Sequence, residues 1–226
     1  MRSKTLKIGV LASGSGTNLQ SIIDRIEEGT LQAEIACVIS NNVGAFALER
    51  ARRHNIPSVY LDHRLFSGRS AYDAALVETL LDHQVELVVL AGFMRILTPV
   101  IIDAFPMKIM NIHPALLPAF PGLHAQKQAL DYGVKIAGCT VHFVDAGTDT
   151  GPIIIQAAVP VQEDDTEETL SARIQVEEHR IYPEAVRLFV EGRLRTDGRR
   201  VIVSGQPEYT SNSFANPSAL YSLGDT

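Results

Sequence analysis

The 226-residue chain has a formal net charge of −6, with 46% hydrophobic and 20% charged residues, a composition typical of a globular protein rather than a disordered one. The acidic balance argues against a broad nucleic-acid surface, which would be basic. No apolar run approaches the ~20 residues of a membrane span. Cys37 and Cys139 lie in separate apolar runs without CxxC spacing, which predicts two buried thiols in a cytoplasmic protein and no metal site.

Apolar runs and helical patterns alternate through the first ninety or so residues. Although the N-terminus is basic and then apolar, the run from Ile8 to Ala12 passes directly into a glycine loop, so we interpret it as a first strand rather than a signal peptide. Leu19, Ile22, Ile23 and Ile26 recur at helical spacing and predict one buried stripe. Alternation with short connections predicts an α/β fold, a Rossmann-like, mostly parallel sheet with helices on both faces. The strand-like runs are 6–12, 33–40, 56–62 and 86–92, and the helical patterns are 17–29, 43–54 and 68–83.

The alternation of apolar runs and helical patterns ends after Gly92. We expect a short turn around Thr98-Pro99, a strand at 108–112, a proline-rich loop, a short helix at 123–132 and two long strands, 135–144 and 152–161, as antiparallel additions to the sheet. A final helix over 166–190 has an apolar stripe at helical spacing. No linker divides residues 1–195, which we predict to be one domain. Residues 196–226 form an extension with one possible short strand, VIVSG, and then a tail. The stripe of the final helix is Leu170, Ile174, Ile181, Ala185 and Leu188.

The stretch ASGSGTNLQ, residues 12–20, joins the first strand to the first helix. Such a junction points free N–H groups and the positive end of the helix dipole at one place, which suits a phosphate, although a tight turn alone would also explain the glycines. Leu19 replaces the third glycine of a dinucleotide fingerprint, and the second strand ends in Ser40-Asn41-Asn42 without an acidic residue. A phosphomonoester is therefore favoured over NAD, and no GKS or GKT sequence marks a nucleotide-triphosphate loop.

Asn111 and His113 stand two residues apart, directly before Pro114. A strand period of two places both on one face near the carboxyl end of the strand, where open parallel sheets bind ligands. Either residue alone is readily explained as structural. Together, an amide that donates to a developing oxyanion and an imidazole that moves a proton suggest catalysis. Asp149 and Asp145 compete as the carboxylate partner, and a solvated turn explains either one.

Other polar residues give weaker signals. Arg95 follows a buried-looking strand and either binds an acidic ligand or caps the sheet. The remaining histidines, at positions 54, 63, 83, 124, 142 and 179, default to structural or surface roles. No serine, cysteine or lysine carries a nucleophile signature. Direct group transfer is therefore more plausible than a covalent intermediate.

Six blocks carry a resemblance that runs from about Leu6 to Leu194: ASGSGTNLQ, LVVLAGFMRIL, MNIHPALLPAFPGLHAQKQAL, GCTVHFV, DTGPIIIQ and EEHRIYP. In order and spacing they closely resemble the folate-dependent phosphoribosylglycinamide formyltransferases of purine biosynthesis. The resemblance implies a single formyltransferase domain, 10-formyltetrahydrofolate as co-substrate and no metal. It implies catalysis by Asn111, His113 and Asp149, contacts to phosphoribosylglycinamide at Gly16, Thr17, Asn18 and Glu178, and contacts to the folate at Arg69, Met94, Arg95, Ile96, Leu97 and Asn111.

The implied chemistry fits these residue types. The substrate amine attacks the formyl carbon, and Asn111 with a protonated His113 stabilises the resulting oxyanion. Asp149 is expected to hold His113 in its cationic form and to assist proton transfer through a water. Pro114, Pro118 and Pro121 are interpreted as stiffening a loop beside this centre.

Several alternatives share these features. Related enzymes use the same catalytic block for hydrolysis of the formyl group or for another amine acceptor, but those with known extra domains extend beyond strand one or the last helix, which favours the ribonucleotide acceptor here. A non-catalytic folate- or phosphate-binding module is a further reading, opposed by the presence of Asn111, His113 and Asp149. We expect small-molecule partners only, without nucleic acid or membrane, and a monomer or weak homodimer.

Overall fold

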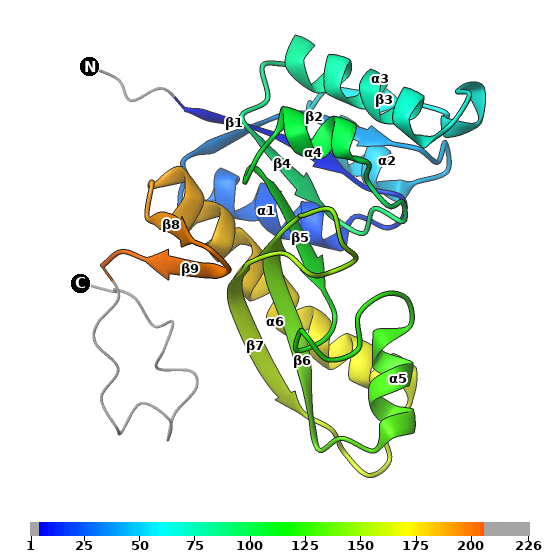
Figure 1. Cartoon of the computed structure of the whole chain (residues 1–226), viewed down its shortest axis with the longest axis vertical. Helices are drawn as coiled ribbons and strands as arrows, with labels where there is room; N and C mark the ends of the chain where they lie inside the picture. The colour runs from blue at the N-terminus through cyan, green and yellow to red at the C-terminus, as the bar shows by residue number, and fades with distance from the viewer. Residues whose placement is uncertain (1–4, 206–226) are drawn as a thin grey trace.

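The computed structural model describes residues 5–205, which form one mixed sheet flanked by helices (Figure 1). The strands are β1 (Leu6–Leu11), β2 (Ala33–Ser40), β3 (Ser58–Tyr60), β4 (Leu87–Leu90), β5 (Ile109–His113), β6 (Ile136–Phe143), β7 (Ile153–Pro160), β8 (Leu194–Asp197) and β9 (Arg200–Val203). The α-helices are α1 (Thr17–Glu27), α2 (Phe46–Arg53), α3 (Arg69–Asp82), α4 (Pro99–Ala104), α5 (Ala125–Tyr132) and α6 (Glu167–Val190), with a 3₁₀ turn, η1, at His63–Leu65.

The sheet order in the described chain is β3-β2-β1-β4-β5-β6-β7-β9-β8. The first five strands in this order, β3, β2, β1, β4 and β5, pair in parallel with their neighbours. Strand β6 is antiparallel to both β5 and β7. The predicted fold class, a mostly parallel sheet with antiparallel additions in the second half, is confirmed. Because the chain turns from β1 to β2 on one side and reaches β4 on the other, the loops after β1 and β4 diverge. This is the switch point at which open α/β sheets bind ligands.

Alternating side chains divide the core between the two faces of the sheet. On β4, Leu87 and Val89 pack with α1, α2 and α6, whereas Val88 and Leu90 pack with α3 and α4. Figure 1 shows α3 and α4 along one face of the sheet and α6 behind β6 and β7. Both faces are therefore covered, as the near-continuous apolar runs of parallel strands require.

Both cysteines lie inside this core. Cys37 and Cys139 are buried and carry no disulfide, in keeping with the sequence prediction. Burial raises the pKa of the Cys37 thiol to about 12 and raises that of Cys139 as well, so both are packed as neutral, unreactive groups at neutral pH.

The first and last long helices match their predicted stripes. Of the α1 stripe, Leu19, Ile22 and Ile23 are buried and Ile26 is partly buried against the same cluster. All five stripe residues predicted for α6 are buried. Its N-terminus has a capping box in which Thr166 and Thr169 exchange side-chain-to-backbone hydrogen bonds.

One local prediction was wrong, and one was incomplete. The turn expected around Thr98-Pro99 is the start of α4, a six-residue helix with proline at its first position, where the missing N–H costs nothing. The possible short strand at VIVSG is present as β9, but it is joined by a strand that was not expected, because LRTD forms β8 and pairs with β9 across a turn at Gly198, whose φ is +58°. This hairpin crosses the boundary expected at residue 195, so the division into 1–195 and 196–226 stays a prediction. The predicted tail after residue 205 lies outside the described residues.

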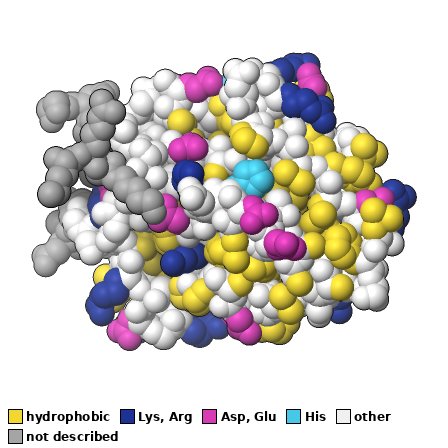
Figure 2. Space-filling model, turned by 90° about the horizontal axis from the view of Figure 1, so that it is seen from above, with side chains coloured by type: hydrophobic (Ala, Val, Ile, Leu, Met, Phe, Trp, Pro, Cys, Tyr) yellow, Lys and Arg dark blue, Asp and Glu magenta, His cyan; other side chains and the backbone are white. Residues whose placement is uncertain are grey.

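The surface agrees with the composition. On the face drawn in Figure 2, Lys and Arg side chains are scattered among acidic and apolar ones instead of forming a basic field. None of the helices within residues 5–205 has the length and apolar character to cross a membrane.

Candidate active site

Strand β5 brings the predicted amide and imidazole to one face. Met110 and Ile112 point into the cluster that packs against α1 and α6, so Asn111 and His113 share the opposite face at the carboxyl end of the strand. The loop between β6 and β7 carries Asp149 to the same place. The nearest oxygens of Asp149 lie 3.3 Å from His113 Nδ1 and 3.5 Å from Asn111 Nδ2. The structure thus brings the three residues together.

Asp149 is held as an anion. Its side chain is largely buried, and its Oδ2 accepts a 2.8 Å hydrogen bond from the Gly122 N–H. Burial raises its pKa, but contacts with His142, the Gly122 N–H and the charge of His113 outweigh that effect, so the pKa of Asp149 lies below its ordinary value. The carboxylate is therefore ionised throughout the neutral range.

The proline loop packs directly on this cluster. The Phe120 carbonyl accepts a 2.8 Å hydrogen bond from His113 Nε2, which leaves both ring nitrogens of His113 facing acceptor oxygens. Thr140 on β6 anchors the loop, since its hydroxyl donates to the Ala115 carbonyl at 2.7 Å and accepts from the Leu117 N–H at 3.1 Å. The loop lies beside Asp149, through the Gly122 N–H, as expected, while the stiffening role of its prolines stays a prediction.

His142 belongs to the cluster, although the sequence suggested a structural or surface role. It lies opposite Asn111 in the pairing of β5 with β6, and its Nε2 is 3.2 Å from Asn111 Nδ2. Its Nδ1 donates to the Phe143 carbonyl at 2.8 Å, which leaves Nε2 able to accept from the Asn111 amide. That contact orients the amide. No local signal in the sequence could have found His142, because the pairing register decides the contact.

Asp145, the competing carboxylate, does not join the cluster. It accepts hydrogen bonds from the Gly147 N–H at 3.1 Å and the Thr150 hydroxyl at 2.6 Å, both within its own loop. It therefore shapes the turn that presents Asp149, whose own φ of +54° lies in the left-handed region.

The glycine loop and α6 meet at a second polar group of residues. Asn18 Nδ2 donates to Glu178 Oε2 at 2.9 Å, and Gln175 donates to the Thr17 hydroxyl at 3.1 Å. Asn18 Oδ1 is buried and has no hydrogen-bond partner, which leaves an acceptor that a ligand hydroxyl could satisfy. Burial raises the pKa of Glu178, and the hydrogen bond from Asn18 only partly offsets it. Gln175 was missed by the sequence reading.

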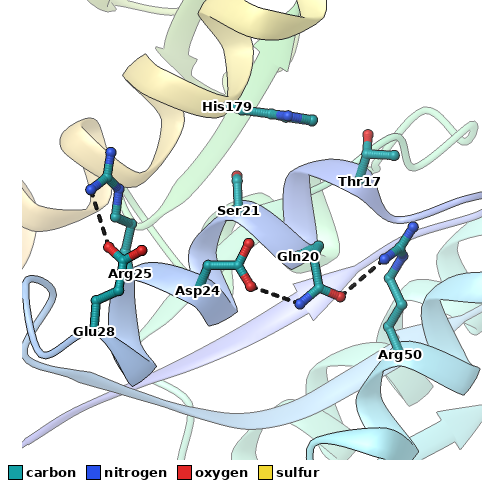
Figure 3. A pocket seen from close by; sticks show the side chains of 8 residues that line it. All are labelled: Thr17, Gln20, Ser21, Asp24, Arg25, Glu28, Arg50 and His179. Carbon is teal, nitrogen blue, oxygen red and sulfur yellow. Dashed lines mark hydrogen bonds and ion pairs between the residues drawn. The ribbon is translucent and has the colours of Figure 1, made fainter.

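A pocket of about 450 Å³ runs along α1 from this junction (Figure 3). Thr17 and Arg50 lie at one end of it and the Arg25–Glu28 ion pair at the other. Arg50 donates to the Ser15 carbonyl at 2.9 Å and to Gln20 at 3.0 Å, so it braces the glycine loop from α2. Gly16 is the N-cap residue before α1 and has a φ of +69°.

The predicted folate residues other than Asn111 fall into four settings. Met94 and Ile96 are 69% and 60% exposed on the loop after β4, while Leu97 is 8% exposed and packs in the core with α3 and α4. Arg95 stacks over the Tyr72 ring, with its Cζ 5.0 Å from the ring centroid. Arg69 is exposed at the start of α3 and makes no hydrogen bond or ion pair within residues 5–205. The structure thus leaves Arg69 unconnected to the other candidates.

The described residues contain no group of three or more His, Cys, Asp or Glu side chains placed to hold a metal. An amide, an imidazole and a carboxylate meet at the strand ends of this α/β sheet, beside a glycine loop suited to an anion. Together these groups can stabilise an oxyanion and move a proton. Such a fold and site define the class of α/β group-transfer enzymes.

Comparison with known proteins gives the family. The formyl transferase family model matches residues 6–186, and the chain belongs to this family. The trifunctional purine biosynthetic protein adenosine-3 of Chironomus tentans is 48% identical over 195 residues, which cover 85% of this chain but only 14% of that much longer protein. Phosphoribosylglycinamide formyltransferase of Escherichia coli is 43% identical over 201 residues, covering 89% of this chain and 95% of the relative.

Solved structures agree with this assignment. Glycinamide ribonucleotide transformylase 1 from Symbiobacterium toebii superposes with a TM-score of 0.88 at 57% identity, covering 89% of this chain and 95% of that one. The chain therefore belongs to the formyl transferase family and has the fold of that family, as the sequence resemblance implied.

Proposed function

We propose that this protein transfers the formyl group of 10-formyltetrahydrofolate to the primary amine of 5'-phosphoribosylglycinamide, giving formylglycinamide ribonucleotide and tetrahydrofolate in purine biosynthesis. The observation that carries the proposal is the Asn111, His113 and Asp149 cluster at the end of β5. The Escherichia coli relative, named for this reaction and matched over nearly its full length, supports the choice of acceptor.

The acceptor site is assigned to the junction of the glycine loop with α6. The phosphate is held by Gly16 and Thr17 at the start of α1, where backbone N–H groups and the helix dipole favour an anion. The ribose hydroxyls are held by Asn18 and Glu178. The unpartnered Asn18 Oδ1 and the desolvated Glu178 carboxyl support this role, because each is an acceptor short of donors.

The folate is assigned to the loop after β4, with Met94, Arg95, Ile96 and Leu97, and to Asn111. Exposed apolar side chains at Met94 and Ile96 suit a flat aromatic ring system. Arg69 is retained as a contact to the acidic folate tail, for which its exposed position at the start of α3 leaves it available. The buried side chain of Leu97 restricts its contribution to backbone contacts.

Catalysis follows from the cluster. The acceptor nitrogen attacks the formyl carbon, a new C–N bond forms, and the carbonyl oxygen takes the electron pair. The Asn111 amide, oriented by His142, donates one hydrogen bond to this oxyanion. His113 donates a second once Nε2 exchanges the Phe120 carbonyl for the substrate oxygen. Asp149 balances the charge of His113 and, through a water, moves the proton from the acceptor nitrogen to N10 of the folate as the C–N10 bond breaks.

The experiment is a turnover assay with 10-formyltetrahydrofolate and phosphoribosylglycinamide, following deformylated folate by absorbance. We expect turnover that requires the amine. His113→Ala should lower kcat by roughly 10²-fold or more, the usual size of a lost oxyanion donor, with KM changed little. His83→Ala, in which a histidine at the end of α3 is removed, serves as the matched control and should retain normal turnover.

The other outcomes identify the alternatives. Deformylation without the amine would indicate a hydrolase, turnover with another amine a different acceptor, and binding of both ligands without turnover a non-catalytic module. Near-normal kcat in His113→Ala would overturn the catalytic assignment. The proposal also retains a cytoplasmic enzyme that acts on small molecules as a monomer or weak homodimer.

A further inference from the structure

Ser13 connects three segments that the sequence separates widely. Its hydroxyl accepts from the Met94 N–H at 2.9 Å and donates to Asn41 Oδ1 at 2.6 Å. Its own N–H donates to the Gly92 carbonyl at 3.0 Å, and its carbonyl accepts from Asn42 Nδ2 at 3.3 Å. Every polar group of Ser13 is therefore engaged, with the loop after β4 or with the end of β2.

These contacts explain what the Ser40-Asn41-Asn42 end of β2 does in place of binding a dinucleotide. Asn41 takes the only proton that the Ser13 hydroxyl can donate, so the hydroxyl lone pairs turn toward the Met94 N–H. A side chain that donates and accepts at once is required at position 13. Alanine provides neither function, and a carboxylate provides no donor.

Side chains of the loop after β4 pack against α3 and α4, where Phe93 and Leu97 are buried and Arg95 stacks over Tyr72, but hydrogen bonds tie its backbone mainly at its two ends. Residues 93–97 belong to no helix or strand. The loop is tied at its start by Ser13, through Gly92 and Met94, and at its end by Asp73, whose Oδ2 accepts from the Thr98 N–H at 2.6 Å. The segment assigned to the folate lies between these two ties.

We propose that Ser13 is a positioning residue that fixes the folate-binding loop against the glycine loop, and that Asn41 orients its hydroxyl for this purpose. The inference rests on the proposed function, because the loop at Met94–Leu97 is assigned to the folate there. Because the Ser13 hydroxyl is engaged by Met94 and Asn41, we assign it a positioning role rather than a substrate contact. Its loss frees the Met94 N–H and loosens the loop before the folate binds, so the cost falls on folate affinity rather than on the chemical step.

The test measures KM for each substrate and kcat in Ser13→Ala, Asn41→Ala, Asn41→Asp and Ser15→Ala. We expect Ser13→Ala to raise KM for 10-formyltetrahydrofolate about fivefold, the effect of one lost neutral hydrogen bond, with kcat and the ribonucleotide KM within twofold. Asn41→Ala should raise the folate KM less. Asn41→Asp, which keeps the acceptor, should restore it, and Ser15→Ala, a serine two residues along the same loop, should leave it unchanged.

An unchanged folate KM in Ser13→Ala would overturn the inference, as would an equal rise in both KM values, which would indicate a general structural role. If Asn41→Asp does not restore the folate KM that Asn41→Ala raises, then Asn41 does not orient the Ser13 hydroxyl. If the wild-type protein shows no turnover, the proposed function fails separately. The same variants are then compared by equilibrium binding of 10-formyltetrahydrofolate, in which Ser13→Ala must still bind more weakly than Ser15→Ala.

Discussion

The two carboxylate oxygens of Asp149 face different partners. One accepts from Gly122 and faces His113, while the other faces Asn111 and His142. The residue therefore ties the proline loop, the strand β5 and the strand β6 to a single charge. Its removal affects both the chemistry and the fold.

Asp149→Asn is expected to lower kcat by roughly 10²-fold or more, because the amide cannot balance a charged His113 or carry a proton. Asp145→Asn, in the same loop but bonded only within it, should keep normal turnover. Steady-state kinetics of the two variants checks this pair. Equal losses in both would show that the loop, not the carboxylate at 149, is what matters.

The lowered pKa of Asp149 also predicts that the stability lost in Asp149→Asn depends on pH. Because the pKa of Asp149 is lowered in the folded state, its contribution to the free energy of unfolding is present above the unfolded pKa of about 3.9 and is lost as the pH falls through the lower folded pKa. Urea unfolding should therefore find wild type more stable than Asp149→Asn at neutral pH. The difference should shrink below about pH 4.

The charge of Glu178 affects stability in the opposite direction to that of Asp149. Burial raises its pKa in the folded state, so ionisation of Glu178 opposes folding as the pH rises above about 4.3, the unfolded value. Glu178→Gln keeps an acceptor for Asn18 but carries no charge. We expect it to raise Tm by about 2–4 °C at pH 7.5, the effect of roughly 1 kcal/mol in a domain of this size, while it weakens binding of the ribonucleotide.

Thermal unfolding at pH 7.5 and pH 4 checks this prediction, since the gain should disappear at the lower pH. Glu177→Gln is the control, because Glu177 pairs with Arg180 on the outer side of α6 and should show no gain. A Glu178→Gln protein less stable than wild type at pH 7.5 would contradict the argument.

At the scale of elements, the glycine loop is shaped by its contact with α2. A Cβ at Gly16 would lie 2.8 Å from Ala47 Cβ and 2.9 Å from its Cα, and the φ of +69° disfavours any side chain. At Gly14, by contrast, a Cβ would meet nothing within 4 Å. Gly16 is therefore required by both backbone and packing.

Gly16→Ala is expected to destabilise the fold by about 1–3 kcal/mol, through strain and the displacement of α2, and to raise KM for the ribonucleotide. Gly14→Ala should stay within about 0.5 kcal/mol of wild type. Denaturant unfolding of both variants separates them. A similar loss in Gly14→Ala would mean that flexibility of the whole loop, rather than the position of Gly16, is what the fold requires.

Elements with regular patterns were predictable, whereas helix α4 and strand β8 were not. Helix α6 has 24 residues and a complete apolar stripe, so its helical period could be recognised in the sequence. Helix α4 has six residues, too few to show a period, and begins at a proline that also marks turns. Strand β8, LRTD, has no apolar alternation and exists because β9 pairs with it.

At the scale of the whole molecule, Tyr182 joins the last helix to the centre of the sheet. Its hydroxyl is fully buried and lies 2.9 Å from both the Leu90 and the Met110 carbonyls, on β4 and β5. This contact seats α6, which carries Glu178, against the strand that carries Asn111.

Tyr182→Phe is expected to lower the free energy of unfolding by about 1–2 kcal/mol, since the hydrogen bond is lost in a buried setting. Tyr132→Phe is the matched control, because that side chain is 80% exposed, and it should change stability by less than about 0.5 kcal/mol. Urea unfolding measures both. A neutral Tyr182→Phe would show that apolar packing alone seats α6.

The sequence by itself determined the parallel half of the sheet, the stripes of α1 and α6, and the shared face of Asn111 and His113, because each depends on a local period of two or 3.6. The family resemblance then named Asp149. Only the tertiary structure decided that His142 faces Asn111, that Asn18 bonds Glu178 and that Ser13 holds the loop at Met94. These contacts join residues 31 to 160 positions apart. Strand order and register set them, and no local pattern in a single sequence records either.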